Sequence, residues 1–240
     1  MRTPWLWVAC CCAVMAACGG STPTGPSAGS SLSRTRFLAF GDSLTAGEIT
    51  VPVASGEAVH GPMIVVPAAS YPAQLLSILQ ARYPAQAAAF SMSNAGKLGE
   101  FVQDGADRFP GTLAASQAEV VLLMEGLNGL LQVGPDFSSE FMRDMVRTAT
   151  AQGVRVFVAS MMPTIAGRSR SASSLALVTY NGKLQQMAAE ERVVYVDLYN
   201  ALLPEALSVI GADGLHPTEV GYRRMAEVFF NAIQANLEVR

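Results

Sequence analysis

The stretch Arg36-Phe37-Leu38-Ala39-Phe40-Gly41-Asp42-Ser43-Leu44 decides the fold of this chain. Its first half, 36–40, is a short and largely apolar run, which is typical of a parallel strand buried on both faces. The run leads directly into Gly-Asp-Ser, a polar turn. We therefore predict a strand over 36–40, with Ser43 at the junction between the carboxyl end of this strand and a following helix.

Similar apolar runs follow along the chain, and helix-like stretches separate them. The further predicted strands cover 87–92, 120–124, 154–160 and 193–198. The predicted helices cover 71–83, 100–116, 138–152 and 172–191, and a last helix starts near Pro217 with Met225, Phe229, Ile233 and Leu237 on one face. Strand–helix alternation of this kind predicts a doubly wound α/β domain, with a five-stranded parallel sheet between helices and right-handed crossovers.

Residues 48–70 interrupt this alternation, since they carry Pro52, Pro62 and Pro67 where a helix would be expected. One interpretation is a surface hairpin or irregular loop that caps the edge of the sheet. The other is a partly apolar lid beside the strand ends where ligands bind, and the two are compatible. His60 lies in this segment with only Glu57 as a nearby acid, so we assign it a structural role or none.

The composition limits the function. Of 240 residues, 50% are hydrophobic and 15% are charged, which excludes a disordered chain. The net charge of -3 argues against a nucleic-acid partner, because such a protein needs a basic face. All four cysteines lie within the first 18 residues, so the body of the chain can form neither a disulfide nor a thiolate metal site.

The beginning of the chain predicts export. Residues 1–17 combine Arg2, an apolar run and small residues, which is the pattern of a signal peptide. The ending Met15-Ala16-Ala17-Cys18 resembles a bacterial lipobox, in which the cysteine is lipidated and becomes the mature N-terminus. Residues 18–33 are rich in Gly, Ser, Thr and Pro and predict a flexible tether before a domain over 34–240. We expect a membrane-anchored lipoprotein of the bacterial cell envelope, with an ordinary secreted protein as the alternative.

Residues suited to acyl-transfer chemistry stand at the predicted strand ends and in the last loop. Ser43 supplies a hydroxyl, and the segment 213–217, Asp-Gly-Leu-His-Pro, supplies an imidazole with a carboxylate that could orient it. Segments 94–99 and 126–128 follow the second and third predicted strands and contain glycine amides and an Asn side chain, which are suitable donors to an oxyanion. Each segment alone is an ordinary cap or turn. Together, at one edge of a sheet, they indicate a hydrolase site.

In this order and spacing, the segments resemble the sequence blocks of the SGNH, or GDSL, hydrolases. The resemblance covers essentially Arg34 to Leu237 and implies a flavodoxin-like α/β/α three-layer sandwich. It also implies hydrolysis of esters or thioesters of lipids, small acyl compounds or sugars, without a metal or organic cofactor. One position departs from the family: its third block usually reads Gly-x-Asn-Asp, and here Gly129 replaces the final Asp.

The resemblance assigns roles to individual residues. It makes Ser43 the nucleophile, His216 the general base and Asp213 the residue that orients the base. The implied oxyanion-hole donors are the backbone amides of Ser43 and Gly96 and the side chain of Asn128. The reaction implied is a two-step acyl transfer through a Ser43 ester.

The substrate is less well defined by the sequence. Several apolar residues after the third strand could line an acyl groove or simply pack inward: Leu127, Leu130, Leu131 and Val133. Arg168 and Arg170 could meet an anionic head group or stay solvated. We expect acyl esters of lipids or small molecules, including lysophospholipids or thioesters. The alternatives are a carbohydrate O-acetyl esterase acting on polysaccharide and a non-catalytic lipoprotein binding module, which has no need of the Ser, His and Asp together.

Overall fold

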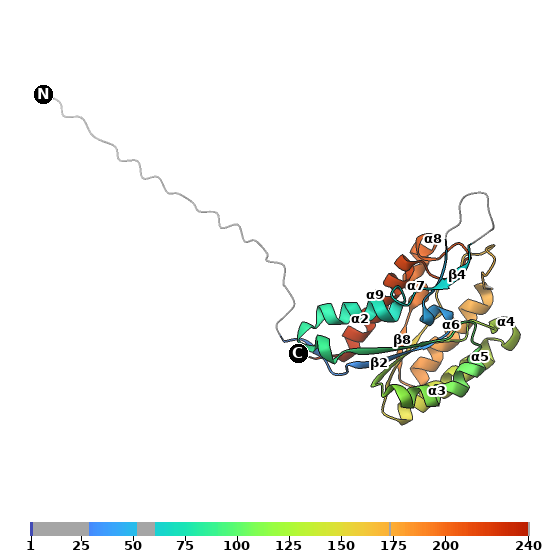
Figure 1. Ribbon diagram of the computed structural model, residues 1–240, viewed down its shortest axis with the longest axis horizontal. Helices are drawn as coiled ribbons and strands as arrows, with labels where there is room; N and C mark the ends of the chain where they lie inside the picture. The colour runs from blue at the N-terminus through green and yellow to red at the C-terminus, as the bar shows by residue number, and fades with distance from the viewer. Residues whose placement is uncertain (2–28, 52–60, 173, 240) are drawn as a thin grey trace.

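The computed structural model describes Met1 and residues 29–51, 61–172 and 174–239. The predictions for Cys18, for the leader and for His60 therefore lie outside the described residues. Five parallel strands form the central sheet in the order β5-β2-β6-β7-β8 (Figure 1). Their bounds are β2 Arg36–Gly41, β5 Ser91–Gly96, β6 Val120–Met124, β7 Arg155–Ala159 and β8 Val194–Val196.

Helices cover both faces of this sheet, with α2 and α9 on one face and α3, α5 and α6 on the other (Figure 1). The long helices are α2 Tyr71–Arg82, α3 Val102–Ser116, α5 Pro135–Ala151, α6 Ser174–Glu190 and α9 Glu219–Leu237. The short ones are α1 Ser43–Ala46, α4 Leu130–Val133, α7 Leu198–Leu202, α8 Ala206–Val209 and the 3-10 turns η1 Pro84–Ala89 and η2 Leu203–Glu205. The predicted α/β fold with a five-stranded parallel sheet is confirmed.

The core follows the apolar patterns of the sequence. All residues of the central strand β6 are buried, as expected for a strand covered on both sides. The predicted apolar face of α9 is buried too, and Phe229 on it stacks on Tyr71 of α2 with ring centroids 4.8 Å apart. Burial of such large side chains contributes about 1.5–3 kcal/mol each to folding. None of the helices among the described residues is long and apolar enough to cross a membrane.

The second predicted strand was misplaced. The run Ala87-Ala88-Ala89 belongs to the 3-10 turn η1, and the strand β5 begins four residues later than predicted, at Ser91. β5 pairs only with β2, its side chains are half-buried or exposed, and its sequence lacks an apolar run. As a consequence, residues 94–96 lie inside the strand and not after it.

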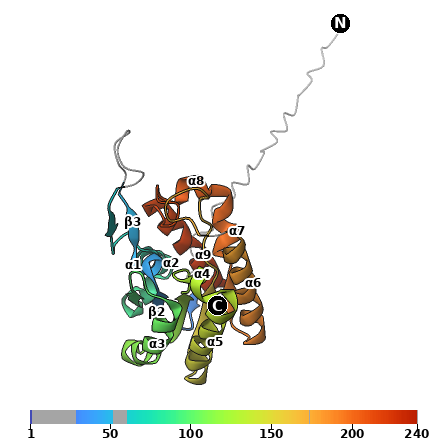
Figure 2. The same ribbon diagram turned by 90° about the vertical axis from the view of Figure 1, so that its right-hand side faces the viewer.

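The segment after α1 contains a hairpin, in agreement with the first interpretation of residues 48–70. Strands β3 Glu48–Thr50 and β4 Met63–Val65 pair antiparallel, and the residues 52–60 between them lie outside the described part. Figure 2 shows this hairpin at one side of the molecule, next to α1. The hairpin therefore begins directly beside the predicted nucleophile.

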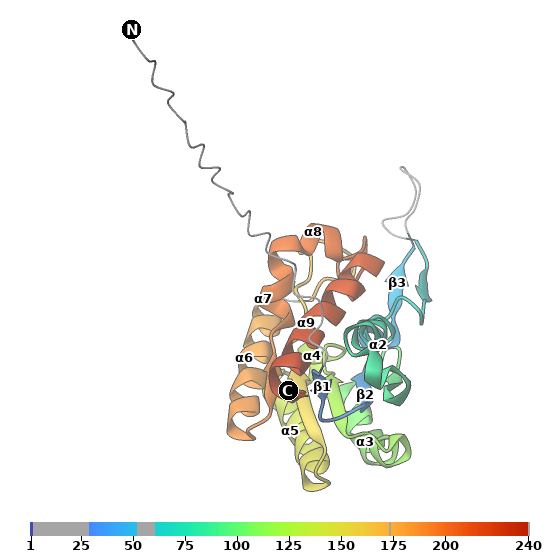
Figure 3. The same ribbon diagram turned by 90° about the vertical axis from the view of Figure 1, so that its left-hand side faces the viewer.

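The folded body also begins earlier than predicted. Strand β1, Ser31–Leu32, lies within the predicted tether and pairs antiparallel with β9, Glu238–Val239. Leu32 is buried. The side chain of Gln86 accepts a hydrogen bond from the Leu32 amide and donates one to the Leu32 carbonyl. The pair joins the two ends of the described body (Figure 3).

Candidate active site

Ser43 stands where the prediction placed it, at the junction between β2 and α1. The side chain of Asp42 caps α1 by accepting a hydrogen bond of 2.9 Å from the amide of Leu44. Ser43 is the first residue of this helix, and its own amide has no hydrogen-bond partner among the described residues. The hydroxyl and a free backbone donor of Ser43 are thus held together at the carboxyl edge of the sheet.

Ser43, His216 and Asp213 form one chain of hydrogen bonds. Ser43 Oγ lies 3.0 Å from His216 Nε2, and His216 Nδ1 lies 2.6 Å from Asp213 Oδ2. The other oxygen of Asp213 accepts from the amides of Leu215 and His216, at 3.1 Å each. Gly214 permits this turn because its φ is +84° and a Cβ there would lie 2.3 Å from the Cβ of Arg168.

Asp213 is ionised at neutral pH. Burial opposes its charge, but the hydrogen bond to the His216 ring and the amides of Leu215 and His216 outweigh burial and lower its pKa to about 2. A carboxylate at Nδ1 favours the tautomer that carries its proton there, so that Nε2 faces Ser43 with a lone pair. The geometry is that of a nucleophile, a base and an orienting acid.

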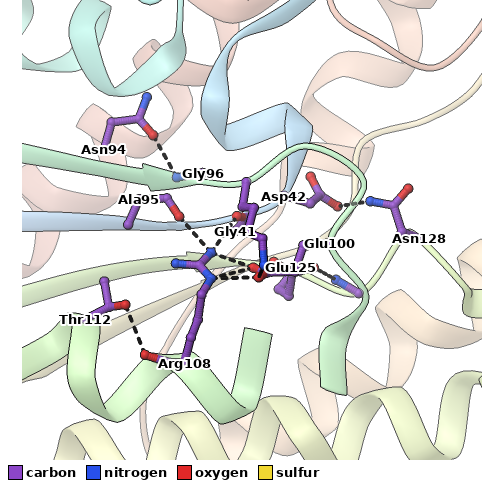
Figure 4. Close-up of polar contacts among 12 residues, drawn as sticks. Gly41, Asp42, Asn94, Ala95, Gly96, Glu100, Arg108, Thr112, Glu125 and Asn128 are labelled. Carbon is purple, nitrogen blue, oxygen red and sulfur yellow. Dashed lines mark hydrogen bonds and ion pairs between the residues drawn. The ribbon is translucent and has the colours of Figure 1, made fainter. Parts of the chain in front are cut away.

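Two of the predicted oxyanion donors, the Asn128 side chain and the Gly96 amide, differ from each other in their hydrogen-bond partners. Asn128 lies beside the nucleophile turn, with its Nδ2 3.4 Å from Asp42 Oδ2. The Gly96 prediction needs correction, since the Gly96 amide donates to the Asn94 side chain at 3.0 Å (Figure 4). The Gly96 amide has this partner because Asn94 and Gly96 lie two residues apart in β5. Gly99, in the turn that follows, has φ +67°, and its amide has no partner among the described residues.

Glu48 is a neighbour of the site that the sequence did not reveal. It is the first residue of β3, it is only 8% exposed, and its Oε2 lies 3.0 Å from His216 Nε2. This is the same ring nitrogen that Ser43 Oγ contacts. His216 therefore has a carboxylate at each of its two ring nitrogens.

Arg108 connects the strand ends beneath the site (Figure 4). It forms a bidentate ion pair with the buried carboxylate of Glu100, with Nε–O distances of 2.7 and 2.8 Å. Its Nη2 also donates to the carbonyls of Gly41 at 3.3 Å and Ala95 at 2.8 Å. The guanidinium lies 4.0 Å from the ring centroid of Phe40. Arg108 thus ties the end of β2, which leads to the nucleophile, to the end of β5.

Two further acids are buried at this edge. Glu125 directly follows β6 and is fully buried; burial first, and then the nearby charge of Asp42, raise its pKa well above the usual range. Its Oε2 has no partner among the described residues. Burial also raises the pKa of Asp42 to about 6, although the Leu44 amide and His216 act in the opposite direction. Acidic groups with raised pKa values in one place are a feature of functional sites.

A cavity of about 250 Å³ opens beside Asn128. Its walls include Leu127, Leu130 and Leu131 from the predicted groove, together with Leu215 and Arg170. The inward-packing interpretation holds in part, since Leu127 and Leu130 are buried while Leu131 is 70% exposed. The two arginines differ in role: Arg170 lines the cavity, whereas Arg168 donates to the carbonyl of Ala212 at 3.0 Å.

Among the residues that the structure describes, no three His, Cys, Asp or Glu side chains are grouped in a way that could hold a metal ion. A buried chain of hydrogen bonds from Ser43 through His216 to Asp213 lies at the carboxyl edge of the α/β sheet, and such a chain is the arrangement that serine hydrolases use. The sequence model of the GDSL-like lipase/acylhydrolase family matches residues 39–224. The chain belongs to this family and is an ester-hydrolysing enzyme.

Solved structures support the fold. The lipase/acylhydrolase from Enterococcus faecalis is 22% identical, with a TM-score of 0.66 over 85% of this chain and 97% of its own. Axe2, an acetylxylan esterase from Geobacillus stearothermophilus, is 21% identical, with a TM-score of 0.64 over 84% and 94%. LAE5, an α/β hydrolase enzyme from the metagenome of Lake Arreo, is 22% identical, with a TM-score of 0.65 over 83% and 94%. Variants of Axe2 in which a serine or a histidine is replaced by alanine are described as catalytic mutants. A search of curated proteins gives no match.

Proposed function

We propose that the protein is a serine esterase that cleaves carboxylic acyl esters through an acyl-enzyme on Ser43. The observation that carries this proposal is the chain of hydrogen bonds from Ser43 Oγ through His216 to Asp213. A serine hydroxyl needs an adjacent base to act as a nucleophile, and that base needs a group to orient it. Similarity in fold to Axe2, where serine and histidine variants are described as catalytic mutants, agrees with this assignment.

In the proposed reaction, His216 Nε2 takes the proton of Ser43 as Oγ attacks the ester carbonyl. The negative charge that develops on the carbonyl oxygen is met by the free Ser43 amide and by the side chain of Asn128. We assign the third donor to Gly99 in place of Gly96, because the Gly96 amide already donates to Asn94. The leaving alkoxide takes the proton from Nε2, and water repeats the sequence to release the acid.

Replacement of Ser43 tests this mechanism directly. We expect Ser43→Ala to lower kcat for p-nitrophenyl acetate or butyrate by about 10⁴-fold or more, since loss of the nucleophile removes the covalent route. A fluorophosphonate probe should label the wild type at Ser43 and leave this variant unlabelled, as read by peptide mass spectrometry. Retention of turnover in Ser43→Ala would sink the assignment.

The cavity beside Asn128 supports acyl esters of lipids or small molecules as substrates. Leucines supply most of its apolar wall, and Arg170 gives it a cationic group that suits an anionic head group, as in a lysophospholipid. A series of p-nitrophenyl esters from acetyl to lauroyl, compared with acetylated xylan and lysophosphatidylglycerol, tests this choice. The highest kcat/KM on acetylated xylan would instead favour a carbohydrate O-acetyl esterase.

We also propose that the enzyme is exported and anchored by lipid at Cys18. Support comes from the lipobox-like sequence Met15-Ala16-Ala17-Cys18 and from the polar stretch that follows it. Expressed with its leader in a bacterium, the wild type should partition into the detergent phase of Triton X-114, and Cys18→Ala should not. Cys11→Ala is the matched control. Equal partitioning of all three proteins would contradict lipidation at Cys18.

A further inference from the structure

The contact between Glu48 and His216 lies at the atom through which the proton moves. Glu48 Oε2 and Ser43 Oγ are each 3.0 Å from His216 Nε2. Glu48 is well fixed there, because its backbone carbonyl accepts a hydrogen bond of 2.7 Å from the buried hydroxyl of Tyr222. The side chain of Glu48 is 11% exposed, so water screens the contact only weakly.

The charge of Glu48 bears differently on the two states of Nε2. When Nε2 carries a proton, the carboxylate accepts a charge-assisted hydrogen bond from it. When Nε2 carries no proton, the carboxylate faces a lone pair and receives no hydrogen bond from the ring. We propose that Glu48 is a further catalytic residue, which stabilises the proton on His216 Nε2 that Ser43 gives up during acylation. This inference rests on the proposed roles of Ser43 and His216.

Stabilisation of this proton has two opposite consequences. At high pH, where the ring of the free enzyme is neutral, Glu48 stabilises the imidazolium that forms as Ser43 attacks, and this accelerates the reaction. At low pH, the same carboxylate holds a proton on the free enzyme, and this removes the base. Glu48 thus raises the rate on one side of the pH–rate profile and lowers it on the other.

Other charged or titratable groups also face the His216 segment and stay in place when Glu48 is changed. They are Asp213 in its own loop, Ser43 and Asp42 at the β2–α1 junction, Tyr222 on α9, and Arg168 and Arg170 in the loop that packs on 211–214. All of them are present in wild type and variant, but Asp42 responds to the change, because the charge of Glu48 helps to raise its pKa to about 6. A difference between the two profiles therefore reports on Glu48 together with its effect on Asp42.

The test compares kcat/KM for p-nitrophenyl acetate, corrected for free hydrolysis, from pH 5 to 9 in the wild type and in Glu48→Gln. The variant keeps the shape of the side chain and removes its charge. We expect the rise of kcat/KM with pH to occur about one pH unit lower in the variant than in the wild type. We also expect the highest kcat/KM of the variant to be lower by up to about tenfold, so that the two pH–rate profiles cross. Glu119→Gln, the same change at the other end of the sheet, should reproduce the wild-type profile.

The other outcomes overturn the proposal. A variant that is slower by the same factor at every pH shows that Glu48 has a structural role. A variant that is faster at every pH shows that Glu48 only blocks the site, and an unchanged profile shows that the contact has no part in the reaction. If Glu48→Gln does not fold, as judged by circular dichroism, Glu48→Ala makes the same test. Failure of the proposed function is seen separately, as missing fluorophosphonate labelling at Ser43 in the wild type.

Discussion

Two glutamates flank the central strand β6, and their surroundings differ sharply. Glu119 precedes the strand and accepts hydrogen bonds from the amides of Thr35 at 2.9 Å and Arg36 at 3.1 Å. Burial opposes its charge, but these bonds and the Arg36 guanidinium outweigh burial and lower its pKa. Glu125 follows the strand, is fully buried, and has a pKa raised well above the usual range.

The contrast between Glu119 and Glu125 reflects a difference between the amino and the carboxyl edge of the sheet. At the amino edge, the carboxylate of Glu119 is 24% exposed and accepts hydrogen bonds from backbone amides, so its charge stabilises the fold. At the carboxyl edge, Glu125, Asp42 and Glu100 are all buried close to one another, and Arg108 is bonded to only one of them. Such an arrangement costs stability and is retained where a site needs controlled charge.

Removal of the arginine at each edge should give the largest contrast. Arg108→Met leaves the buried carboxylate of Glu100 with the exposed Lys97, 3.2 Å away, as its remaining ion-pair partner, and we expect the free energy of unfolding to fall by about 3 kcal/mol. Arg36→Met breaks a half-exposed pair with Glu119, and we expect a loss of about 1 kcal/mol or less. Urea denaturation at pH 7, followed by circular dichroism, measures both. Equal losses would show that burial of the pair does not matter.

Replacement of one asparagine at each edge of the sheet tests which edge carries the catalytic activity. Asn128→Ala removes a proposed oxyanion donor, and we expect kcat to fall by about 10²–10³-fold with little change in KM. Asn236→Ala, near the end of α9, removes a bond to the carbonyl of Ala232 and should leave kcat unchanged. Steady-state kinetics on p-nitrophenyl acetate measures both. A loss confined to KM in Asn128→Ala would mean that Asn128 binds the substrate and does not stabilise the oxyanion.

The pH dependence of stability should have opposite signs for the two glutamates. Because folding raises the pKa of Glu125, its contribution is complete below about pH 4.5 and is lost as pH rises, by up to about 1.4 kcal/mol per pH unit. Folding lowers the pKa of Glu119, so its contribution is present above about pH 4.5 and is lost as pH falls. Glu125→Gln should therefore flatten the alkaline side of the stability curve, and Glu119→Gln the acidic side. Urea midpoints from pH 3 to 8 test this, and a flattening on the same side in both variants would contradict it.

The residues of the site differ in how far sequence could reveal them. Ser43 and the pair Asp213–His216 were predictable because each lies in a short local motif, and the structure brings them together as expected. Glu48 was not, since its contact with His216 joins residues that are far apart in the chain and depends on the path of the β3–β4 hairpin. Glu125 did leave a signal: it is a charged residue directly after an apolar strand.

The fold shows the same division. Strands β2, β6, β7 and β8 follow apolar runs and were located to within a few residues. The edge strand β5 has the sequence Ser-Met-Ser-Asn-Ala-Gly, in which no apolar run marks the backbone pairing with β2. The prediction of Gly96 as an oxyanion donor placed it in a loop after the strand. Gly96 is instead the last residue of β5, and its amide donates to the Asn94 side chain. Apolar patterns report burial, and the side chains of β5 are half-buried or exposed.

The pairing of β1 with β9 determines on which side of the described body the chain can be attached to a surface. Both ends of the described body meet at the amino edge of the sheet, whereas Ser43 lies at the far edge because β2 runs from Arg36 to Gly41 (Figure 3). A molecule attached at either end of the described body is therefore attached on the side opposite Ser43. Attachment at this side leaves the edge of the sheet that carries Ser43 open to substrate from solution.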